Sequence, residues 1–224
     1  MAQDSATHEK QKANKDDTEE VVVPGISAFI GILLTGLLYL VLPSNVTFGP
    51  NWLLLGIEVV FIVPLILDIL TAWDLSHMAR RTLVLTPLVL STIALVSGVA
   101  LFIFSLPTNT NATNLLRAAG LLWFFNILVF ALWYWEIDGG GPWRRHRAGH
   151  LAVDLLFPQQ ADGKRWAPDF FDYLFVAFTG ATAFSPTDTF PLTKKAKMLM
   201  MGEAIISLTV IAIIAARAVN IIGK

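Results

Sequence analysis

Five long apolar runs constrain the fold of this chain more than any other feature. Each holds roughly 20 residues or more, the length that a helix needs to cross the roughly 30 Å hydrocarbon core of a membrane. Backbone N–H and C=O groups in lipid must be satisfied within the protein, so such runs cross as helices. We therefore predict an all-α fold, a polytopic transmembrane helical bundle. The runs are residues 21–42, 52–73, 83–106, 115–137 and 198–222.

The composition agrees with this class and excludes several others. The chain is 55% hydrophobic and 15% charged, whereas soluble domains carry about 25% charged residues. A net charge of −1 gives no electrostatic basis for binding nucleic acid. The chain has no cysteine, which excludes disulfides, thiolate metal sites and a cysteine nucleophile.

Catalytic motifs are missing from the sequence. There is no G-x-S-x-G and no H-E-x-x-H, the patterns of serine hydrolases and zinc proteases. On a helix, His146, His150 and Asp154 would share one face and could hold a metal, but the neighbouring arginines argue against that. We expect no enzymatic activity, no cofactor and no metal.

Charge divides the chain into four parts. Residues 1–20 carry nine charges and no apolar core, which predicts a disordered tail. Residues 21–137 hold the first four runs as a four-helix transmembrane region. Residues 138–168 form a basic, amphipathic connector. Residues 169–224 contain a short apolar segment, the turn TAFSPTD and the last run.

Basic residues predict the orientation. If the first four runs all cross, the basic residues of the tail, of the loop after the second run and of the connector lie on one side, which should be cytoplasmic. The N-terminus is then cytoplasmic as well. These residues are Lys10, Lys12, Lys15, Arg80, Arg81, Arg144, Arg145 and Arg147.

The segment 169–184 decides between six spans and five. Its apolar part is about 16 residues, roughly 24 Å as a helix, which is slightly short of the hydrocarbon core. If it crosses, the chain has six spans; if it is re-entrant from the cytoplasm, the chain has five. We expect it to cross, because local thinning of the bilayer accommodates a short span.

Charged residues inside the apolar runs are the first functional candidates. Such groups are costly in lipid and usually face the bundle interior, a partner or water. Asp68 and Arg217 are candidates for an ion pair, with Glu58 as the nearer acid for Arg217 if there are five spans. Glu58 and Glu203 are candidates for an ion or proton pathway. The structural alternative is one internal ion pair plus an acid that is neutral or hydrogen-bonded.

The turn TAFSPTD is the second candidate. The hydroxyls of Thr182, Ser185 and Thr187, with the carboxylate of Asp188, could form a cation site. The alternative is a helix stop, since Ser-Pro-Thr-Asp is favourable turn and N-cap chemistry.

The connector carries a third candidate, for membrane lipids. A run of glycines at 139–141 precedes Arg144, Arg145 and Arg147. The glycines could cradle phosphate, but no Walker or dinucleotide pattern accompanies them. We expect these arginines to contact anionic lipid headgroups.

The strings WEIDGGGPWRRH, FTGATAFSPTD and LTKKAKMLMM resemble an uncharacterised family of bacterial polytopic integral membrane proteins, over roughly residues 120–222. That resemblance implies a bacterial inner membrane and this fold type, and no mechanism.

The last hundred residues also resemble pore-loop, potassium-channel-like proteins in the order pore helix, filter, inner helix. TAFSPTD aligns with T-T-V-G-Y-G-D through Thr182 and Asp188, but Ser185 and Thr187 replace the filter glycines. Those glycines allow the carbonyl cage, so potassium selectivity is not implied.

These observations lead to two functional hypotheses. The first is a channel-like or transport protein for a small monovalent cation, in which the last two apolar segments form the conduction element. A pore loop would require a homotetramer, since one loop cannot close a filter. The second is a non-transporting scaffold, or a module that binds lipid or a protein partner through residues 143–150.

Overall fold

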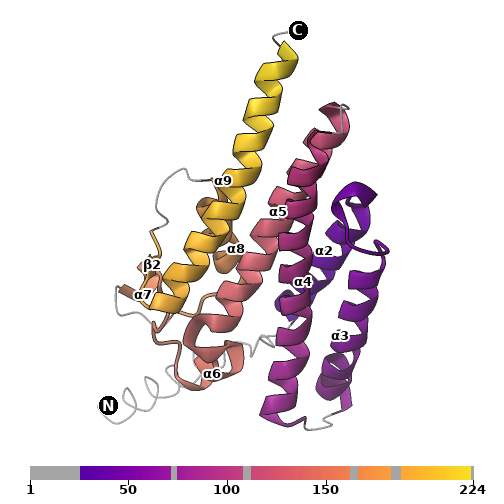
Figure 1. The fold of residues 1–224 in the computed structure, drawn as a ribbon. Helices are drawn as coiled ribbons and strands as arrows, with labels where there is room; N and C mark the ends of the chain where they lie inside the picture. The colour runs from indigo at the N-terminus through magenta and orange to yellow at the C-terminus, as the bar shows by residue number, and fades with distance from the viewer. Residues whose placement is uncertain (1–25, 72–74, 108–111, 162–165, 183–187, 223–224) are drawn as a thin grey trace, which may run out of the picture.

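The computed structural model describes residues 26–71, 75–107, 112–161, 166–182 and 188–222. Apart from turns and connecting segments it is helical, with two strands of two residues each in the described part (Figure 1). The predicted all-α class is confirmed. The tail at 1–20 lies outside the described residues.

The first four helices run up and down beside one another. They are α2 (Ile26–Val41), α3 (Leu53–Thr71), α4 (His77–Ser105) and α5 (Ala112–Ile137). Figure 1 shows α2, α3 and α4 on one side of α5.

Side chains close the turn between α2 and α3. The amide of Asn51 donates to the carbonyl of Leu42 at 2.8 Å, and the Phe48 N–H donates to the Tyr39 hydroxyl at 2.9 Å. The turn also contains the 3-10 helix η1 (Ser44–Val46). The turn thereby satisfies backbone groups that the end of α2 would otherwise leave open.

The connector after α5 folds into a compact unit at one end of the bundle. It contains η2 (Asp138–Gly140), α6 (Pro142–Arg147), β1 (Leu155–Leu156) and α7 (Pro158–Ala161). The glycines at 139, 140 and 141 have φ angles of 61°, 82° and 103°, a region that residues with a side chain rarely adopt. Pro142 then starts α6 with the fixed φ that suits a first helical position.

The chain then enters and leaves the bundle at the same end. Helix α8 (Phe170–Thr182) packs on α5, and β2 (Phe190–Pro191) pairs antiparallel with β1, with Leu155 opposite Pro191. Helix α9 (Lys194–Ile222) starts directly after β2. In Figure 1, α9 runs from the end that holds α6 and α7 to the C-terminus at the opposite end.

This path bears on the expectation that 169–184 crosses. The β1–β2 pairing brings the chain to the end of the bundle where α8 begins, so α8 and α9 start at the same end. The hydrogen bond from Leu192 N to Asp154 O, at 2.9 Å, fixes the return. Because α8 has only 13 residues, it is about 20 Å long.

Three helices of the described part are long and apolar enough to cross a membrane: Met78–Ser105, Thr113–Arg147 and Lys194–Arg217. Phe29–Val41 and Phe170–Thr182 are shorter apolar helices. These lengths and compositions indicate membrane insertion and are compatible with an integral membrane protein.

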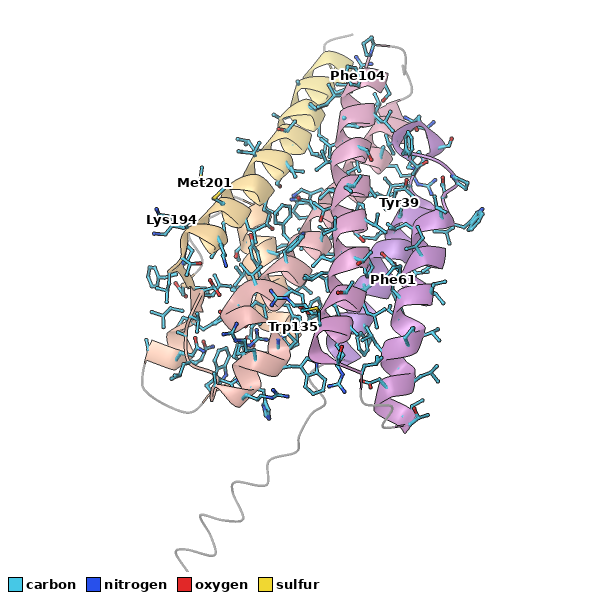
Figure 2. All side chains as sticks on the ribbon, turned by 60° about the horizontal axis from the view of Figure 1, so that its bottom comes forward. Tyr39, Phe61, Phe104, Trp135, Lys194 and Met201 are labelled. Carbon is cyan, nitrogen blue, oxygen red and sulfur yellow. The ribbon has the colours of Figure 1, made fainter. Side chains whose placement is uncertain are left out.

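Helix α5 is the centre of the bundle and α9 is its most exposed long helix. In the apolar 18-residue stretch of each helix, 61% of the stretch in α5 is buried but only 17% of the stretch in α9. Phe104 and Met201, labelled in Figure 2, lie on the outside of α4 and α9 and are 77% and 63% exposed. Exposed apolar side chains of this kind suit contact with lipid or with another protein.

Candidate functional site

Glu203 of α9 lies fully buried where α5, α8 and α9 meet. The Tyr134 hydroxyl of α5 donates a short hydrogen bond to its Oε2 atom. On the other side the carboxyl group packs against Gly180, where a β-carbon would lie 2.9 Å from Oε2. A glycine in α8 therefore makes the room that the Glu203 side chain occupies.

Helix α8 ends inside the bundle, two residues beyond this contact. The Ala181 carbonyl accepts hydrogen bonds from the Ser207 hydroxyl of α9, at 2.5 Å, and from Trp123 Nε1 of α5, at 3.4 Å. Trp123 Nε1 also donates to Ser207 Oγ at 2.9 Å. The last carbonyls of a helix have no intrahelical donors, so α5 and α9 supply donors for one of them. Irregular backbone is tolerated at membrane depth only when protein or water satisfies it.

Glu203 has no counter-ion among the residues that the structure describes. The ion pairs found there involve Asp68 and Asp138 instead. Its Oε1 atom and Asn126 Oδ1 are also buried without a hydrogen-bond partner there. A buried carboxyl without a cationic partner is costly unless it holds a proton or a cation. The C-terminal end of α8 adds negative partial charge beside it. The surroundings of Glu203, which we call the Glu203 pocket for the side chains that enclose its carboxyl, therefore favour positive charge and disfavour anions.

Glu58 lies fully buried in a second packed cluster, between α2, α3 and α4. The hydroxyls of Thr35 and Ser91 donate to its Oε1 atom at 2.7 and 3.1 Å. Gly36 faces its Oε2 atom, which has no hydrogen-bond partner in the described part of the chain. The hydrogen-bond partners of Glu58 and Glu203 do not overlap, so the structure places the two pathway candidates in separate clusters.

Asp68 pairs with a different arginine from the one expected. Its Oδ2 atom lies 2.7 Å from Arg80 Nε, and its Oδ1 atom accepts from Leu75 N at 2.8 Å. Arg217 instead donates from Nη2 to the carbonyl of Leu106 at 3.3 Å. The reason is the direction of α9: it starts at the end of the bundle where α3 stops, so Arg217 reaches the opposite end.

Two of the four turn residues can be placed. The Thr182 hydroxyl donates to Thr179 O at 3.1 Å, within the last turn of α8. Asp188 is exposed. Ser185 and Thr187 lie outside the described residues, so the cation site predicted at this turn stays a prediction.

Arg145 corrects the expectation that all three arginines of the connector contact lipid. It is 2% exposed, and its Nη1 atom donates to the carbonyls of Trp135 and Asp138 at 3.1 and 2.9 Å. The guanidinium lies over the rings of Trp135 and Tyr173, 4.8 and 5.1 Å from their centroids. Arg144 and Arg147 are exposed. The tight glycine turn directs Arg145 back under α5 and leaves the other two outside.

Two buried aspartates tie the connector to α8 and α9, and sequence reasoning missed both roles. Asp138 accepts from the Tyr173 hydroxyl at 2.6 Å and from Asp154 N at 3.2 Å. Asp154 accepts from Gly139 N at 3.1 Å and from the Thr193 hydroxyl at 2.7 Å. The four side chains, with Arg145, form what we call the connector knot. Its only sequence signal was an aspartate beside three glycines.

The two histidines do not share a helix, because α6 ends at Arg147. His146 Nδ1 and His150 Nε2 lie 3.2 Å apart, and Asp154 is engaged in the connector knot. Burial lowers the pKa of His150, with smaller contributions from His146 and the positive charge of Arg145. No group of three or more metal-ligating side chains is found within the described ranges.

Comparison with protein-family models, with curated proteins and with solved structures finds no match for this chain.

Proposed function

We propose that this chain is an integral membrane protein that moves a small monovalent cation, protons included, past the pocket of Glu203. One observation carries the proposal: a helix that ends inside the bundle places its C-terminal turn against a fully buried carboxyl that has no counter-ion in the described part of the chain. Half-helix C-terminal ends of this kind coordinate sodium ions and protons in transporters. The proposal includes no catalytic activity.

The proposed topology has five spans, α2, α3, α4, α5 and α9, with α8 as a re-entrant helix. The support is the return of the chain through β2 to the connector. Basic residues at the starts of α4 and α9 and in α6 then share one end, which is the cytoplasmic end under the positive-inside rule. The membrane is the bacterial inner membrane and the N-terminus is cytoplasmic.

The order of elements supports a channel-like version of this function. In the proposed topology a re-entrant helix, α8, precedes a crossing helix, α9, with β2 between them, as in pore-loop proteins. With Ser185 and Thr187 in place of filter glycines, such a path would discriminate weakly among monovalent cations. Several copies, four in the pore-loop arrangement, would surround it.

Flux measurements on purified protein in liposomes test the proposal. Glu203→Gln removes the charge and keeps the shape, so flux of protons, sodium or potassium should fall at least about tenfold. Glu58→Gln is the matched control, since it makes the same change in the pocket between continuous helices, and we expect less than about a threefold effect. Wild-type liposomes without flux of any of these ions, or equal losses in both variants, would contradict the proposal.

One observation favours the alternative of a lipid-binding scaffold. Arg144 and Arg147 are exposed beside Trp143, which is 39% exposed and lies under the guanidinium of Arg80 at 5.2 Å. An exposed tryptophan with arginines suits the headgroup region. If Arg144→Ala with Arg147→Ala abolishes selective binding of anionic lipid, and no flux is ever seen, the scaffold is the better description.

A further inference from the structure

The two oxygens of the Glu203 carboxyl differ in their surroundings. Oε2 accepts the hydrogen bond from Tyr134, whereas Oε1 is buried without a hydrogen-bond partner in the described part of the chain. Tyr134 is the titratable side chain that contacts the carboxyl, and α8 contributes the uncharged Gly180. The charged side chains of α5, α8 and α9 lie nearer the ends of those helices. They are Arg117, Glu136, Asp172, Lys194, Lys195, Lys197 and Arg217.

A second acceptor at the interface of α5 and α9 also lacks a donor. The amide nitrogen of Asn126 donates to the backbone carbonyl of Glu203 at 3.3 Å. Because a carbonyl can only accept, this bond fixes the orientation of the amide and leaves Asn126 Oδ1 as an acceptor. Oδ1 is buried without a partner among the described residues. A proton added at this interface meets a free acceptor, and on Glu203 it also removes the cost of a buried charge.

A metal cation would need more oxygens than this site supplies. An ion that sheds its water needs several oxygens in place of the hydration shell. The oxygens at the end of α8 are already engaged, because the Ala181 carbonyl accepts from Ser207 and from Trp123. The Ser207 hydroxyl in turn accepts from Trp123. A β-carbon at Gly180 would lie 2.9 Å from Oε2 of Glu203, so the backbone of α8 fills the space beside the carboxyl.

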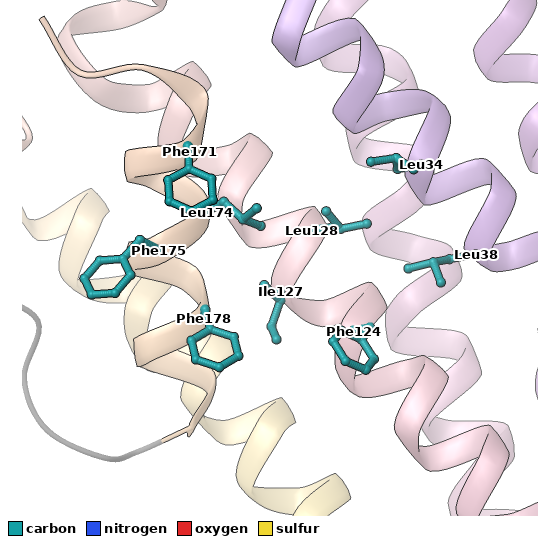
Figure 3. A pocket seen from close by; sticks show the side chains of 9 residues that line it. All are labelled: Leu34, Leu38, Phe124, Ile127, Leu128, Phe171, Leu174, Phe175 and Phe178. Atoms are coloured by element: carbon teal, nitrogen blue, oxygen red, sulfur yellow. The ribbon is translucent and has the colours of Figure 1, made fainter.

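The apolar groove on the other side of α8 does not supply ligands either. Figure 3 shows this groove between α2 and α8, with α5 as its floor. All its lining side chains are apolar, and those from α8 are Phe171, Leu174, Phe175 and Phe178. Since helical residues advance by about 100° each, these side chains lie on the side of α8 away from Gly180. Helix α8 therefore separates the groove from Glu203, and the groove offers a hydrated metal ion no polar entry.

We propose that the ion held at Glu203 is a proton bound to Oε1, and not a metal cation. Binding adds one proton to the carboxylate and makes it neutral, and release returns that proton and restores the negative charge. Tyr134 is a positioning residue, because its hydrogen bond keeps Oε2 as the carbonyl oxygen of the acid and leaves Oε1 to carry the proton. The inference deepens the proposed function and rests on it for the role of this site in transport.

Infrared spectroscopy of the purified protein at pH 7 tests the proposal. A protonated carboxyl has a C=O stretch that is separate from the bands of carboxylates and amides. The spectrum of the wild type minus that of Glu203→Gln isolates the band of this one group. Glu58→Gln is the matched control, since it makes the same change at the other buried glutamate. The spectra are recorded without alkali ions and then with an excess of sodium chloride or potassium chloride.

We expect a Glu203 band at pH 7 that neither salt removes and that Glu58→Gln retains. Tyr134→Phe should retain the band and move it to higher frequency, because a C=O bond strengthens when it loses an accepted hydrogen bond. This shift also tests the proposal if Glu203→Gln fails to fold.

Three results would overturn the proposal. Absence of the band at pH 7 would mean that the carboxyl is ionised. Removal of the band by either salt would mean that a metal cation displaces the proton. An unshifted band in Tyr134→Phe would overturn the assignment of the proton to Oε1.

The infrared result and the flux result are independent. A protonated Glu203 in a protein without flux would overturn the proposed function and leave the proton site standing. Flux of sodium or potassium through a protein in which Glu203 is ionised would overturn the proton site alone.

Discussion

Glu58 and Glu203 are both fully buried, both accept hydroxyl hydrogen bonds, and both pack against a helix glycine. The helices around them differ. Glu58 lies between three continuous helices that pack side by side, whereas Glu203 faces the end of α8. The Glu58 pocket therefore needs only neutral donors to be a stable structural site. The Glu203 pocket adds the partial negative charge of a helix end, which is the feature that attracts a cation.

The same comparison shows what each pocket depends on. The partners of Glu58 come from helices close along the chain. The connector knot holds the starts of both α8 and α9, the two helices that meet at Glu203. A substitution in the connector knot, far from Glu203, can therefore disrupt the surroundings of Glu203 and leave those of Glu58 intact.

The largest effect should come from Arg145→Ala. Removing one partner of a buried charge pair costs about 3–5 kcal/mol, and Arg145 is 4.0 Å from Asp138 as well as bonded to two carbonyls. We expect thermal unfolding in detergent to begin at a much lower temperature and proteolysis to open α8 first. Arg144→Ala, one residue away and exposed, is the control and should change stability by less than about 0.5 kcal/mol. Equal behaviour of the two variants would show that the knot is dispensable.

Alanine substitutions at Gly36 and Gly180 should have effects of intermediate size that differ between the two sites. A β-carbon at Gly36 would lie 2.9 Å from the Leu55 Cα atom, so α2 and α3 must move apart, at a cost of about 1–3 kcal/mol. At Gly180 the close atoms belong only to the carboxyl end of Glu203. Gly180→Ala should therefore unfold near the wild-type temperature but reduce flux, because the carboxyl is displaced. If Gly180→Ala destabilises as much as Gly36→Ala, the two pockets are equally rigid.

Removing hydroxyl donors should give a smaller difference in stability, with the larger loss now at Glu203. Tyr134 is the hydrogen-bond donor that the structure shows for the Glu203 carboxyl, so Tyr134→Phe leaves it unsatisfied at a cost of about 1–3 kcal/mol. Ser91→Ala leaves Thr35 bonded to Glu58 and should cost about 1 kcal/mol. Unfolding temperatures of the two variants, measured side by side, check the order. A larger loss for Ser91→Ala would reverse the comparison.

The smallest effect lies outside both pockets, at His150. Its folded-state pKa is lowered, so the neutral form stabilises the fold above the unfolded pKa of about 6.5, and this contribution is lost as the pH falls through the folded-state pKa. His150→Gln should show a slightly weaker loss of thermal stability between pH 7.5 and pH 5. An identical pH profile for the variant would exclude a contribution from His150.

Much of the helical framework could be predicted from hydrophobic length alone. The run 115–137 appears as α5 (Ala112–Ile137), and the run 198–222 as α9 (Lys194–Ile222). The direction of the segment after the connector could not be predicted, because an apolar stretch of 13 to 16 residues suits both a thin span and a re-entrant helix. Charge counting did not resolve it either.

The candidate site, too, could be predicted from the sequence only in part. That Glu58 and Glu203 are buried follows from their position in apolar runs, since lipid disfavours an exposed carboxyl. The basic run predicts lipid contact for Arg145 as for its neighbours Arg144 and Arg147, and nothing in the local sequence distinguishes it. Its burial depends on the glycine turn and on the ring of Tyr173, 28 positions further along the chain.

The sequence by itself determined that this chain forms apolar helices, because backbone groups in lipid must be satisfied within each segment. Only the tertiary structure decided that α8 ends inside the bundle, that α8 and α9 start at the same end, and that the end of α8 meets Glu203. The physical reason is that these outcomes depend on contacts between distant residues, such as Asp154 with Thr193 and Ala181 with Ser207. Local hydrophobicity and helix propensity carry no information about such pairs.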